Sequence, residues 1–340
     1  MIREFIFDIS KEYPLLARDE IICCFNAEGI QFELIKSTED VLILKSDVSN
    51  ETIRIISSRL SMSFSIGELL FVSKPTIESV QEQAKNQPIN DKGRLAVRYK
   101  NRSDTYESKP FVQTVADVYT KKRSVDLSNP DQIIYLLITP EVVFVSDQIA
   151  QVNRSAFEQR KAQFRPFFSP ISLHPKIARS LVNISEVNEQ NMLLDPFCGT
   201  GGILLEAGLM DIKVIGSDIS AHMVSGTKEN LNEYNITAVN MFSCDIGDIS
   251  TFLPNPVDAV VTDFPYGKST SLQGESLQKL YTRSFMSIQQ VLKLTGRAVI
   301  GSAIKNVDPY VSSGLKQVTT YPLRVHRSLT RFFHVFEKTP

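Results

Sequence analysis

The sequence has few cysteines, no long apolar run and almost no net charge. Its 340 residues include four cysteines, at positions 23, 24, 198 and 244, without a C-x-x-C spacing. Neither a zinc site nor a disulfide framework is therefore expected, and we predict no bound metal. No apolar run reaches about 18 residues, the length that spans a membrane. The first residues lack the apolar core of a signal peptide, so these absences favour a cytoplasmic protein without a membrane span.

The remaining composition is that of a globular protein. Hydrophobic residues make up 42% of the chain and charged residues 22%, which is ordinary for folded domains. The length allows two or three domains, each with its own core. The net charge of −1 excludes no class of binding partner, but the distribution of charged residues along the chain is informative.

Residues 1–74 predict a small α+β unit. Strands are expected at 2–10, 30–37, 41–45 and 62–72, and helices at 14–26 and 49–60. Thr38-Glu39-Asp40 separates two alternating runs and predicts a hairpin. The order β-α-β-β-α-β is that of a ferredoxin-like domain, a fold that by itself names no function.

Residues 75–150 predict a second α+β unit with a basic surface. Helices are expected at 76–86 and 111–122, and strands at 93–99, 132–138 and 142–145. Between Lys92 and Arg123 there are nine basic residues and three acidic ones, a local charge of +6. Such a cluster suits a phosphate backbone, although a solvated surface explains charge alone equally well.

Two segments of this unit resemble the THUMP domain. They are Leu95-Ala96-Val97-Arg98 and the eight residues 124–131, S-V-D-L-S-N-P-D. THUMP domains are RNA-binding modules of tRNA-modifying enzymes. The resemblance implies that the unit binds tRNA through its basic side chains, for which we name Arg94, Arg98, Lys100, Lys121, Lys122 and Arg123.

The rest of the chain predicts a linker and an α/β domain. Residues 151–172 hold no clear core pattern, whereas residues 173–340 alternate strands with helices, as in a parallel sheet. A long amphipathic helix is expected over 276–294. Segments 316–327 and 331–337 then predict an antiparallel pair.

A glycine-rich turn organises this last domain. The apolar residues 192–194 are followed by D-P-F-C-G-T-G-G over 195–202 and then by a helix. The glycines lack the G-x-G-x-x-G spacing of dinucleotide-binding folds. The turn instead resembles the S-adenosylmethionine loop of Rossmann-fold class I methyltransferases, which implies that cofactor.

Four carboxylates fall at the ends of successive predicted strands, at Asp195, Asp218, Asp245 and Asp263. Ligands of open α/β sheets bind at that edge. Asp218 follows Gly199 by 19 residues, where a carboxylate can accept from ribose hydroxyls. By resemblance, Asp245 would bind the adenine amino group and Asp195 would order the loop. The predicted cofactor residues are Asp195, Pro196, Gly199, Thr200, Gly201, Asp218, Ile219, Asp245 and Ile246.

The tetrapeptide Asp263-Phe264-Pro265-Tyr266 resembles the (D/N/S)-P-P-(Y/F/W) motif of methyltransferases that modify exocyclic amines of bases. Such an amine is a poor nucleophile because its lone pair is delocalised into the ring. Asp263 and the Phe264 carbonyl would accept its two N–H bonds and stabilise the charge that forms. Tyr266 would stack on the flipped base. Phe264 replaces the usual proline, which removes a restriction on φ and puts the rigidity of the loop in question.

Four segments together resemble the archaeal and eukaryotic THUMP-domain tRNA guanosine-10 N2-methyltransferases: 166–183, 195–206, 263–269 and 324–331. The resemblance implies methylation of a guanosine N2 amine in tRNA, most simply at position 10, and association with a small zinc-binding activator protein. Three alternatives stay open: a related enzyme acting at another tRNA or rRNA position, a DNA amino-methyltransferase, and an inactive RNA-binding protein.

Overall fold

The computed structural model describes residues 2–90, 92–121, 123–169, 172–265, 275–326 and 329–340. The chain divides into two compact units. The first contains Met1–Pro14, Ile30–Ser58 and Ser63–Val152, and the second contains Leu15–Gly29, Arg59–Met62 and Asn153–Pro340. Within the described residues, no helix is long and apolar enough to cross a bilayer.

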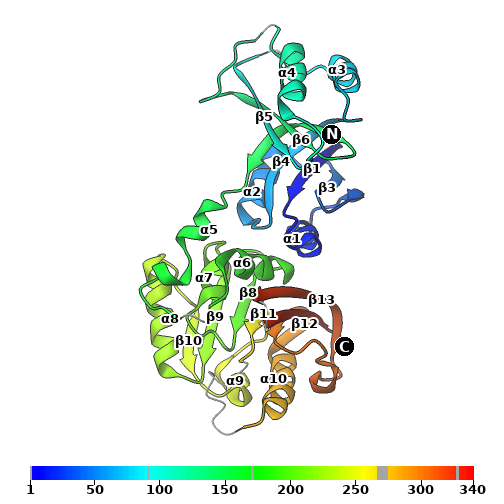
Figure 1. Ribbon diagram of the computed structural model, residues 1–340. Helices are drawn as coiled ribbons and strands as arrows, with labels where there is room; N and C mark the ends of the chain where they lie inside the picture. The colour runs from blue at the N-terminus through cyan, green and yellow to red at the C-terminus, as the bar shows by residue number, and fades with distance from the viewer. Residues whose placement is uncertain (1, 91, 122, 170–171, 266–274, 327–328) are drawn as a thin grey trace. The chain divides into compact units, whose positions relative to one another are not determined.

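The amino-terminal half contains seven strands and four helices among its described residues (Figure 1). In chain order these are β1 (Arg3–Ile9), α1 (Pro14–Ala27), β2 (Glu33–Ser37), β3 (Val41–Ser46), α2 (Asn50–Arg59), β4 (Ser63–Ser73), α3 (Ile77–Asn86), β5 (Leu95–Asn101), α4 (Ser108–Tyr119), β6 (Gln132–Ile138) and β7 (Val143–Gln151). The order β-α-β-β-α-β expected for the first segment is therefore present.

All seven strands belong to one sheet, in the order β2-β3-β1-β4-β7-β6-β5. Strands β5 and β6 are parallel, and every other neighbouring pair is antiparallel. The pairing of β4 with β7 joins the two segments that the sequence analysis treats as separate units. Local patterns give no sign of this pairing, because it connects residues about 80 positions apart.

Local signals place most of these elements correctly. Strands β2 and β3 form the expected hairpin, closed by a 2.9 Å bond from the Thr38 N–H to the Val41 carbonyl. The Ser49 hydroxyl caps α2 by accepting from the Thr52 N–H at 3.0 Å. Thr76 caps α3 in the same way. These caps satisfy N–H groups that a helix leaves without an internal partner.

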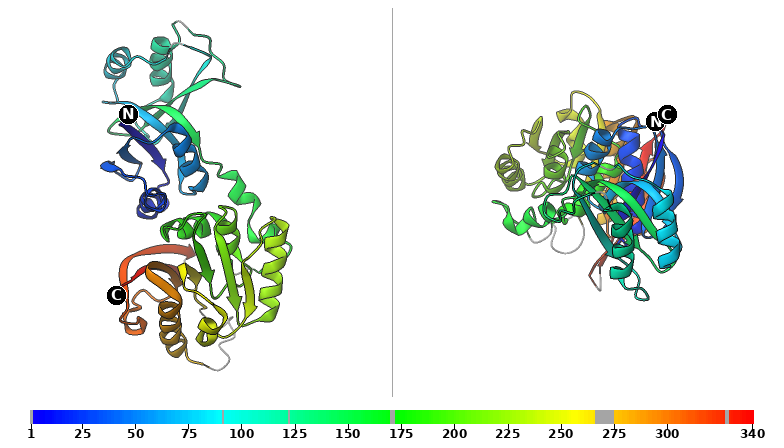
Figure 2. Two further views of the ribbon diagram at one scale, coloured as in Figure 1. Left: turned by 180° about the vertical axis from the view of Figure 1, so that it is seen from behind. Right: turned by 90° about the horizontal axis from the view of Figure 1, so that it is seen from above.

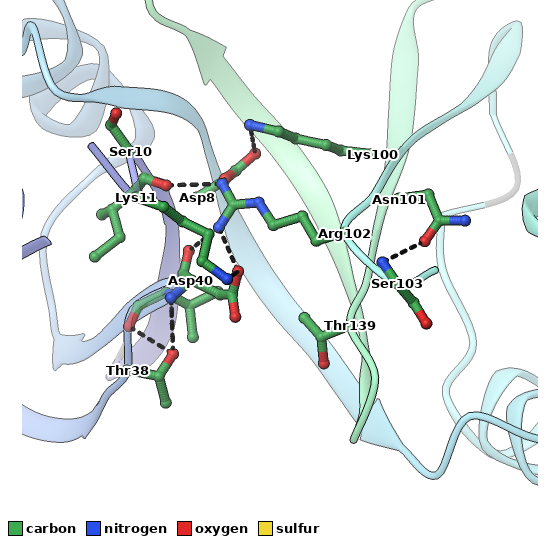
Figure 3. A network of polar contacts seen from close by, with 12 residues as sticks. Asp8, Ser10, Lys11, Thr38, Asp40, Lys100, Asn101, Arg102, Ser103 and Thr139 are labelled. Atoms are coloured by element: carbon green, nitrogen blue, oxygen red, sulfur yellow. Dashed lines mark hydrogen bonds and ion pairs between the residues drawn. The ribbon is translucent and has the colours of Figure 1, made fainter. Parts of the chain in front are cut away.

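A buried ion cluster joins three strands and a turn of the first unit (Figure 3). Asp8 is 3% exposed, and its Oδ1 pairs with Arg102. Its Oδ2 accepts from the Tyr135 hydroxyl at 2.8 Å and lies 3.6 Å from the Lys100 ammonium nitrogen. Arg102 also reaches Asp40, at 2.7 Å. Burial raises the pKa of Asp8, and the charges of Arg102 and Lys100 oppose that rise.

The carboxyl-terminal segment adds two short helical turns before the second sheet. They are α5 (Ser155–Gln159) and the 3₁₀ turn η1 (Ala162–Phe164). The next elements are α6 (Pro175–Ile184), β8 (Met192–Asp195), α7 (Gly202–Gly208), β9 (Lys213–Asp218), α8 (Ala221–Glu233), β10 (Asn240–Ser243), η2 (Ile246–Asp248), α9 (Ile249–Phe252) and β11 (Val257–Asp263). The last are α10 (Leu277–Val291), β12 (Leu292–Ser302), η3 (Asp308–Tyr310), β13 (Leu315–His326) and β14 (Leu329–Lys338).

The second sheet has the order β10-β9-β8-β11-β12-β14-β13. The five strands from β10 to β12 are parallel, and β14 and β13 add an antiparallel end. Helices cover both faces of this sheet (Figure 2). Ile215 of β9 belongs to a core cluster with Tyr281 and Phe285 of α10, whereas Gly216 lies against Leu204 of α7. Because successive strand residues point to opposite faces, α10 and α7 lie on opposite faces.

Several boundaries differ from the sequence analysis; the strand expected at 142–145, for example, continues to Gln151. The helix predicted to run to Leu294 ends at Val291, and Leu292–Leu294 begin β12. Leu292 is fully buried and pairs with Val257 of β11, so tertiary pairing overrides the helical pattern there. The helix expected from Phe111 begins at Ser108.

The segment 151–172, expected to be a linker, belongs to the second unit from Asn153 onward and packs within it. Phe157 is 5% exposed, and Arg160 forms an ion pair with the buried Glu206 at 2.9 Å. The Phe167 N–H donates to Asn230 at 2.9 Å, and the Phe167 ring lies against Gly226, where any Cβ would overlap it. Phe157 and Phe167 therefore serve as packing groups, whereas Phe164 and Phe168 are exposed.

The ion cluster of Figure 3 allows a test of what stabilises the first unit. Arg102→Ala leaves the buried Asp8 carboxylate with less compensation and should lower the free energy of unfolding by about 3–5 kcal/mol at pH 7.5. The loss should be smaller at pH 5 than at pH 7.5, because burial raises the pKa of Asp8, the loss of Arg102 raises it further, and such a carboxylate takes up a proton more readily as the pH falls. Urea unfolding would measure both values. The control is Arg54→Ala, which breaks an exposed pair with Glu51 and should change stability by about 0.5 kcal/mol or less; equal losses in both variants would contradict the interpretation.

Candidate active site

The strand order of the second sheet reverses between β8 and β11. Strands β9 and β10 follow on one side of β8, and β12 follows on the far side of β11. In open α/β sheets such a reversal leaves a crevice at the carboxyl ends of the two central strands. Asp195 is the last residue of β8 and Asp263 is the last residue of β11. Asp218 ends β9 and Asp245 follows β10 by two residues, so the expected placement of all four carboxylates is confirmed.

Asp195 links the two central strands. Its Oδ1 accepts from the Thr262 hydroxyl of β11 at 2.7 Å and from the Phe197 N–H at 3.2 Å. The side chain is 2% exposed, and burial raises its pKa to about 7, assisted by the charges of Asp218 and Asp263. A crowded, buried set of carboxylates favours either protons or an external cation.

Asp218 supports the glycine turn. Its two oxygens accept from the Gly199 N–H at 3.1 Å and from the Ser220 N–H at 2.9 Å. Gly199 and Gly201 have φ values of +52° and +77°, and a Cβ at Gly201 would lie 2.6 Å from Thr227 Cγ2. The backbone can hold this shape only with glycine at these positions. Substitution of Asp218 would therefore disturb the turn as well as any ribose contact.

The other predicted cofactor residues surround this turn. Thr200 is buried and its hydroxyl lies 3.0 Å from that of Ser172. The Pro196 carbonyl accepts from the Ser217 hydroxyl at 3.3 Å. Ile246 is 4% exposed, whereas Ile219 is 45% exposed and offers an apolar surface beside Asp218.

Asp245 has a partner that the sequence analysis missed. Arg283 of α10 forms ion pairs with both of its oxygens and also binds Glu275 at 2.7 Å. Hydrogen bonding to Arg283 lowers the pKa of Asp245, and the Gly247 N–H adds a bond of 2.8 Å. Arg283 lies 38 residues away in a helix without a motif, so no sequence signal identifies it.

Asp263 combines burial, one ion pair and an unused oxygen. Its side chain is 19% exposed, and Oδ2 lies 3.2 Å from Arg331 Nη1 of β14. Its Oδ1 is buried and has no hydrogen-bond partner among the described residues. Burial raises the pKa of Asp263 to about 6, and the charge of Arg331 opposes the rise. The carboxylate is therefore largely ionised at neutral pH and can still accept a hydrogen bond.

Phe264 is anchored by its side chain. It is 1% exposed and packs against the rings of Phe197, Tyr281 and Phe285, with centroid distances of 5.3, 4.9 and 5.6 Å. Its N–H donates to the Gly301 carbonyl at 2.9 Å, a bond that proline could not form. The Pro265 carbonyl accepts from the Tyr281 hydroxyl at 3.4 Å. Ring burial thus replaces the restriction on φ lost with proline, while Tyr266 lies outside the described residues.

The predicted RNA-binding side chains of the first unit differ in their surroundings. Arg94 pairs with Asp126 and Asp131 at 3.0 and 3.1 Å, and Lys100 pairs with buried Asp8. Arg123 is 9% exposed and donates to the Asn90 and Gly93 carbonyls. Arg98 and Lys121 are exposed, although Arg98 also donates to the Leu127 carbonyl. Lys122 lies outside the described residues.

These contacts reduce the basic excess counted along the sequence. Part of the positive charge is neutralised by Asp8, Asp40, Asp126 and Asp131, which lie outside the stretch that was counted. Arg98 and Lys121 are the described candidates best placed to meet a phosphate backbone.

In the part of the chain that the structure describes, no group of three or more metal-ligating side chains occurs.

Comparisons with known proteins agree on the class of enzyme. The chain matches the RMKL-like methyltransferase domain family over residues 162–331. It also matches a DNA methylase family over residues 3–229, a range that ends before Asp263. A tRNA (guanine(10)-N2)-dimethyltransferase of Methanothermobacter thermautotrophicus is 32% identical over 335 residues, which cover 97% of this chain and 98% of the relative.

Solved structures support the fold. TrmN from Thermus thermophilus superposes with a TM-score of 0.57 at 18% identity, over 98% of this chain and 99% of that one. The methyltransferase SMU.472, solved in complex with SAH, gives a TM-score of 0.53 at 12% identity, over 98% of this chain and 97% of that one. At these identities the likeness concerns the fold alone.

The raised pKa of Asp195 predicts how stability depends on pH. Its folded pKa of about 7 exceeds the usual value of 3.8, so between these values the folded state binds more protons than the unfolded state. Stability should therefore fall as pH rises from about 4 to 7. Asp195→Asn keeps the acceptor for Thr262 without the charge, and should be more stable at pH 8 by on the order of 2 kcal/mol.

Urea unfolding at pH 5 and pH 8 would check this prediction. The asparagine variant should show a smaller loss of stability between the two pH values than the parental protein. Asp104→Asn, at an exposed position, is the control and should change neither value. If Asp195→Asn keeps the parental pH dependence, the Asp195 carboxyl does not titrate as described.

Proposed function

Because this chain belongs to the tRNA (guanine(10)-N2)-dimethyltransferase family, we propose that it methylates the exocyclic N2 amine of guanosine 10 in tRNA with S-adenosylmethionine. The observation that carries the proposal is the coincidence of two independent features. A relative with that activity matches almost the entire chain, and Asp263 lies at the carboxyl end of β11 with an oxygen that has no hydrogen-bond partner among the described residues.

The residues at the sheet edge fit the cofactor. S-adenosylmethionine supplies a methyl group bound to a positively charged sulfur. The buried carboxylates Asp195 and Asp218 suit a cationic ligand, since burial raises the pKa of both and a positive charge nearby would favour their ionised forms. Gly199 and Gly201 allow close approach of the backbone. Asp218 and Ile219 would hold the ribose, and Asp245 and Ile246 would hold the adenine.

Asp263 is the residue that we assign to the chemical step. Its carboxylate would accept one N–H of the guanine amine and the Phe264 carbonyl would accept the other, which turns the nitrogen lone pair toward the methyl group. When the methyl group passes from sulfur to nitrogen, the sulfur–methyl bond would break and the neutral thioether would leave, while the carboxylate would stabilise the positive charge that develops on nitrogen. A pKa of about 6 also suits Asp263 to receive the proton that the nitrogen then releases. Tyr266 would stack on the flipped base.

We assign residues 1–150 to tRNA binding, as a ferredoxin-like domain at 1–74 followed by a THUMP domain at 75–150. The antiparallel order β2-β3-β1-β4 with two intervening helices supports the first assignment. The exposed Arg98 and Lys121 support the second. Association with a small zinc-binding activator remains a proposal from family resemblance, and copurification of a tagged chain with its cellular partners would test it.

Substrate class can be tested directly against the alternatives. Purified enzyme with labelled cofactor should methylate a tRNA transcript and leave duplex DNA and rRNA unlabelled. Replacement of guanosine 10 by adenosine should abolish labelling. Labelled DNA with unlabelled tRNA would favour a DNA amino-methyltransferase, and labelling that survives the replacement would move the target elsewhere on tRNA.

Asp263→Asn tests the catalytic assignment. It keeps the size and one acceptor oxygen but removes the charge that stabilises the transition state. Single-turnover methylation should slow by roughly 100-fold or more, whereas affinities for tRNA and cofactor stay near parental values. Rapid-quench kinetics and calorimetry would measure the two effects. A parental single-turnover rate would show that the acceptor lies elsewhere.

Arg98 and Lys121 test the assignment of the first unit. The double variant Arg98→Ala, Lys121→Ala should weaken tRNA binding and reduce the slope of log affinity against log salt by about one to two, since each phosphate contact contributes about 0.7–0.9. Arg123 is left intact, because it is buried and its loss would disturb the fold. Lys228→Ala, at an exposed position of α8, is the matched control and should keep the parental slope. An unchanged slope in the double variant would exclude these two contacts.

A further inference from the structure

We propose that Arg331 is a positioning residue that holds Asp263 as an oriented carboxylate anion, in a space that Gly301 leaves open. This inference rests on the proposed function and names two residues that act on the same site. Arg331 is part of β14 and Gly301 is part of β12, so they meet Asp263 of β11 only through the folding of the sheet.

The ion pair is placed where it can orient Asp263. Arg331 is 6% exposed and its Nη1 lies 3.2 Å from Asp263 Oδ2. Oδ1 has no hydrogen-bond partner among the described residues. A carboxylate turns readily about its last torsion unless a partner holds it. With one oxygen held by Arg331, the other is left for a donor that comes from outside.

Gly301 provides the room for this arrangement. A Cβ at this position would overlap Asp263 Oδ1 and would lie 2.7 Å from Phe333 Cε1. Residues Asp263 and Gly301 are register partners in neighbouring parallel strands, and Gly301 pairs with Phe333 of β14. Gly301 also accepts from the Phe264 N–H, so it anchors the chain directly after Asp263.

Arg331 also acts on the ionisation of Asp263. The titratable groups that face this carboxylate in the described structure are Arg331 from β14, Asp195 from β8 and Tyr281 from α10. Of these, Arg331 alone is a cation. Burial raises the pKa of Asp263 to about 6, and Arg331 lowers it. Removal of that charge must raise the pKa further, and only the ionised form carries the negative charge that stabilises the amine nitrogen and can receive its proton.

Arg331→Gln tests the proposal through a pH profile. Single-turnover methylation of a tRNA transcript by the parental enzyme should show an acid limb near pH 6. In the variant this limb should move to higher pH by about one unit or more, which lowers the rate at pH 6 by about fivefold or more and restores most of it at pH 9. Arg331→Lys keeps the charge and should keep the limb within about half a unit. A limb at the parental pH in Arg331→Gln overturns the proposal.

A double variant keeps the proposal testable if Arg331→Gln alters the local structure. Added to Asp263→Asn, Arg331→Gln should slow methylation by less than about threefold, because its partner is already neutral. The full single-variant loss in that background would show that Arg331 acts independently of Asp263, and would overturn the proposal. Calorimetry should find the parental affinity for cofactor in Arg331→Gln.

Gly301→Ala independently tests whether the space beside the Asp263 carboxylate is required. The added methyl group should displace the carboxylate, and the single-turnover rate should fall at least tenfold at every pH while cofactor affinity is kept; a parental rate counts against the role of Gly301.

An inactive parental enzyme on tRNA would overturn the proposed function and this proposal together. An active parental enzyme with an unmoved acid limb in Arg331→Gln overturns the role of Arg331 alone.

Discussion

The structure of the second unit depends on the burial of carboxylates at one edge of its sheet. Asp195, Asp218 and Asp263 end neighbouring strands, and burial raises the pKa of each. Carboxylates in such surroundings are costly unless donors or cations compensate them. That cost is the constraint around which the glycine turn, the Thr262 hydroxyl and the Arg331 side chain are arranged. It also explains why this edge suits a cofactor with a positively charged sulfur.

Each carboxylate is compensated in a different way, and the differences correspond to the roles that we assign. Asp218 accepts from two backbone N–H groups, so it shapes the turn that would approach the cofactor. Asp245 pairs with Arg283, and hydrogen bonding to that guanidinium lowers its pKa. Asp263 keeps one oxygen without a described partner and a pKa of about 6. Of these three, Asp263 is the one that combines an acceptor oxygen without a partner among the described residues with a near-neutral pKa, and a proton acceptor needs both.

The first unit also buries charged side chains, and there they stabilise the fold. Asp8 and Arg102 are buried together between strands, where neither charge is accessible to a ligand. Arg123 is likewise buried and binds backbone carbonyls. Several residues of the basic stretch therefore hold the fold together, and the surface available to an RNA backbone is smaller than a count of charges indicates. A local excess of lysine and arginine is an upper limit to a binding surface.

The sequence by itself determined the order of elements, the glycine turn and the four carboxylates at strand ends, because these depend on periodicity and on residues adjacent in the chain. It also carried the Asp263 tetrapeptide and the family resemblance. Only the tertiary structure decided that β4 and β7 join the amino-terminal strands into one sheet. The partners of the site residues, Arg283 and Arg331, likewise come from distant elements. Pairings of this kind depend on which strands and helices become neighbours, and no local pattern encodes that.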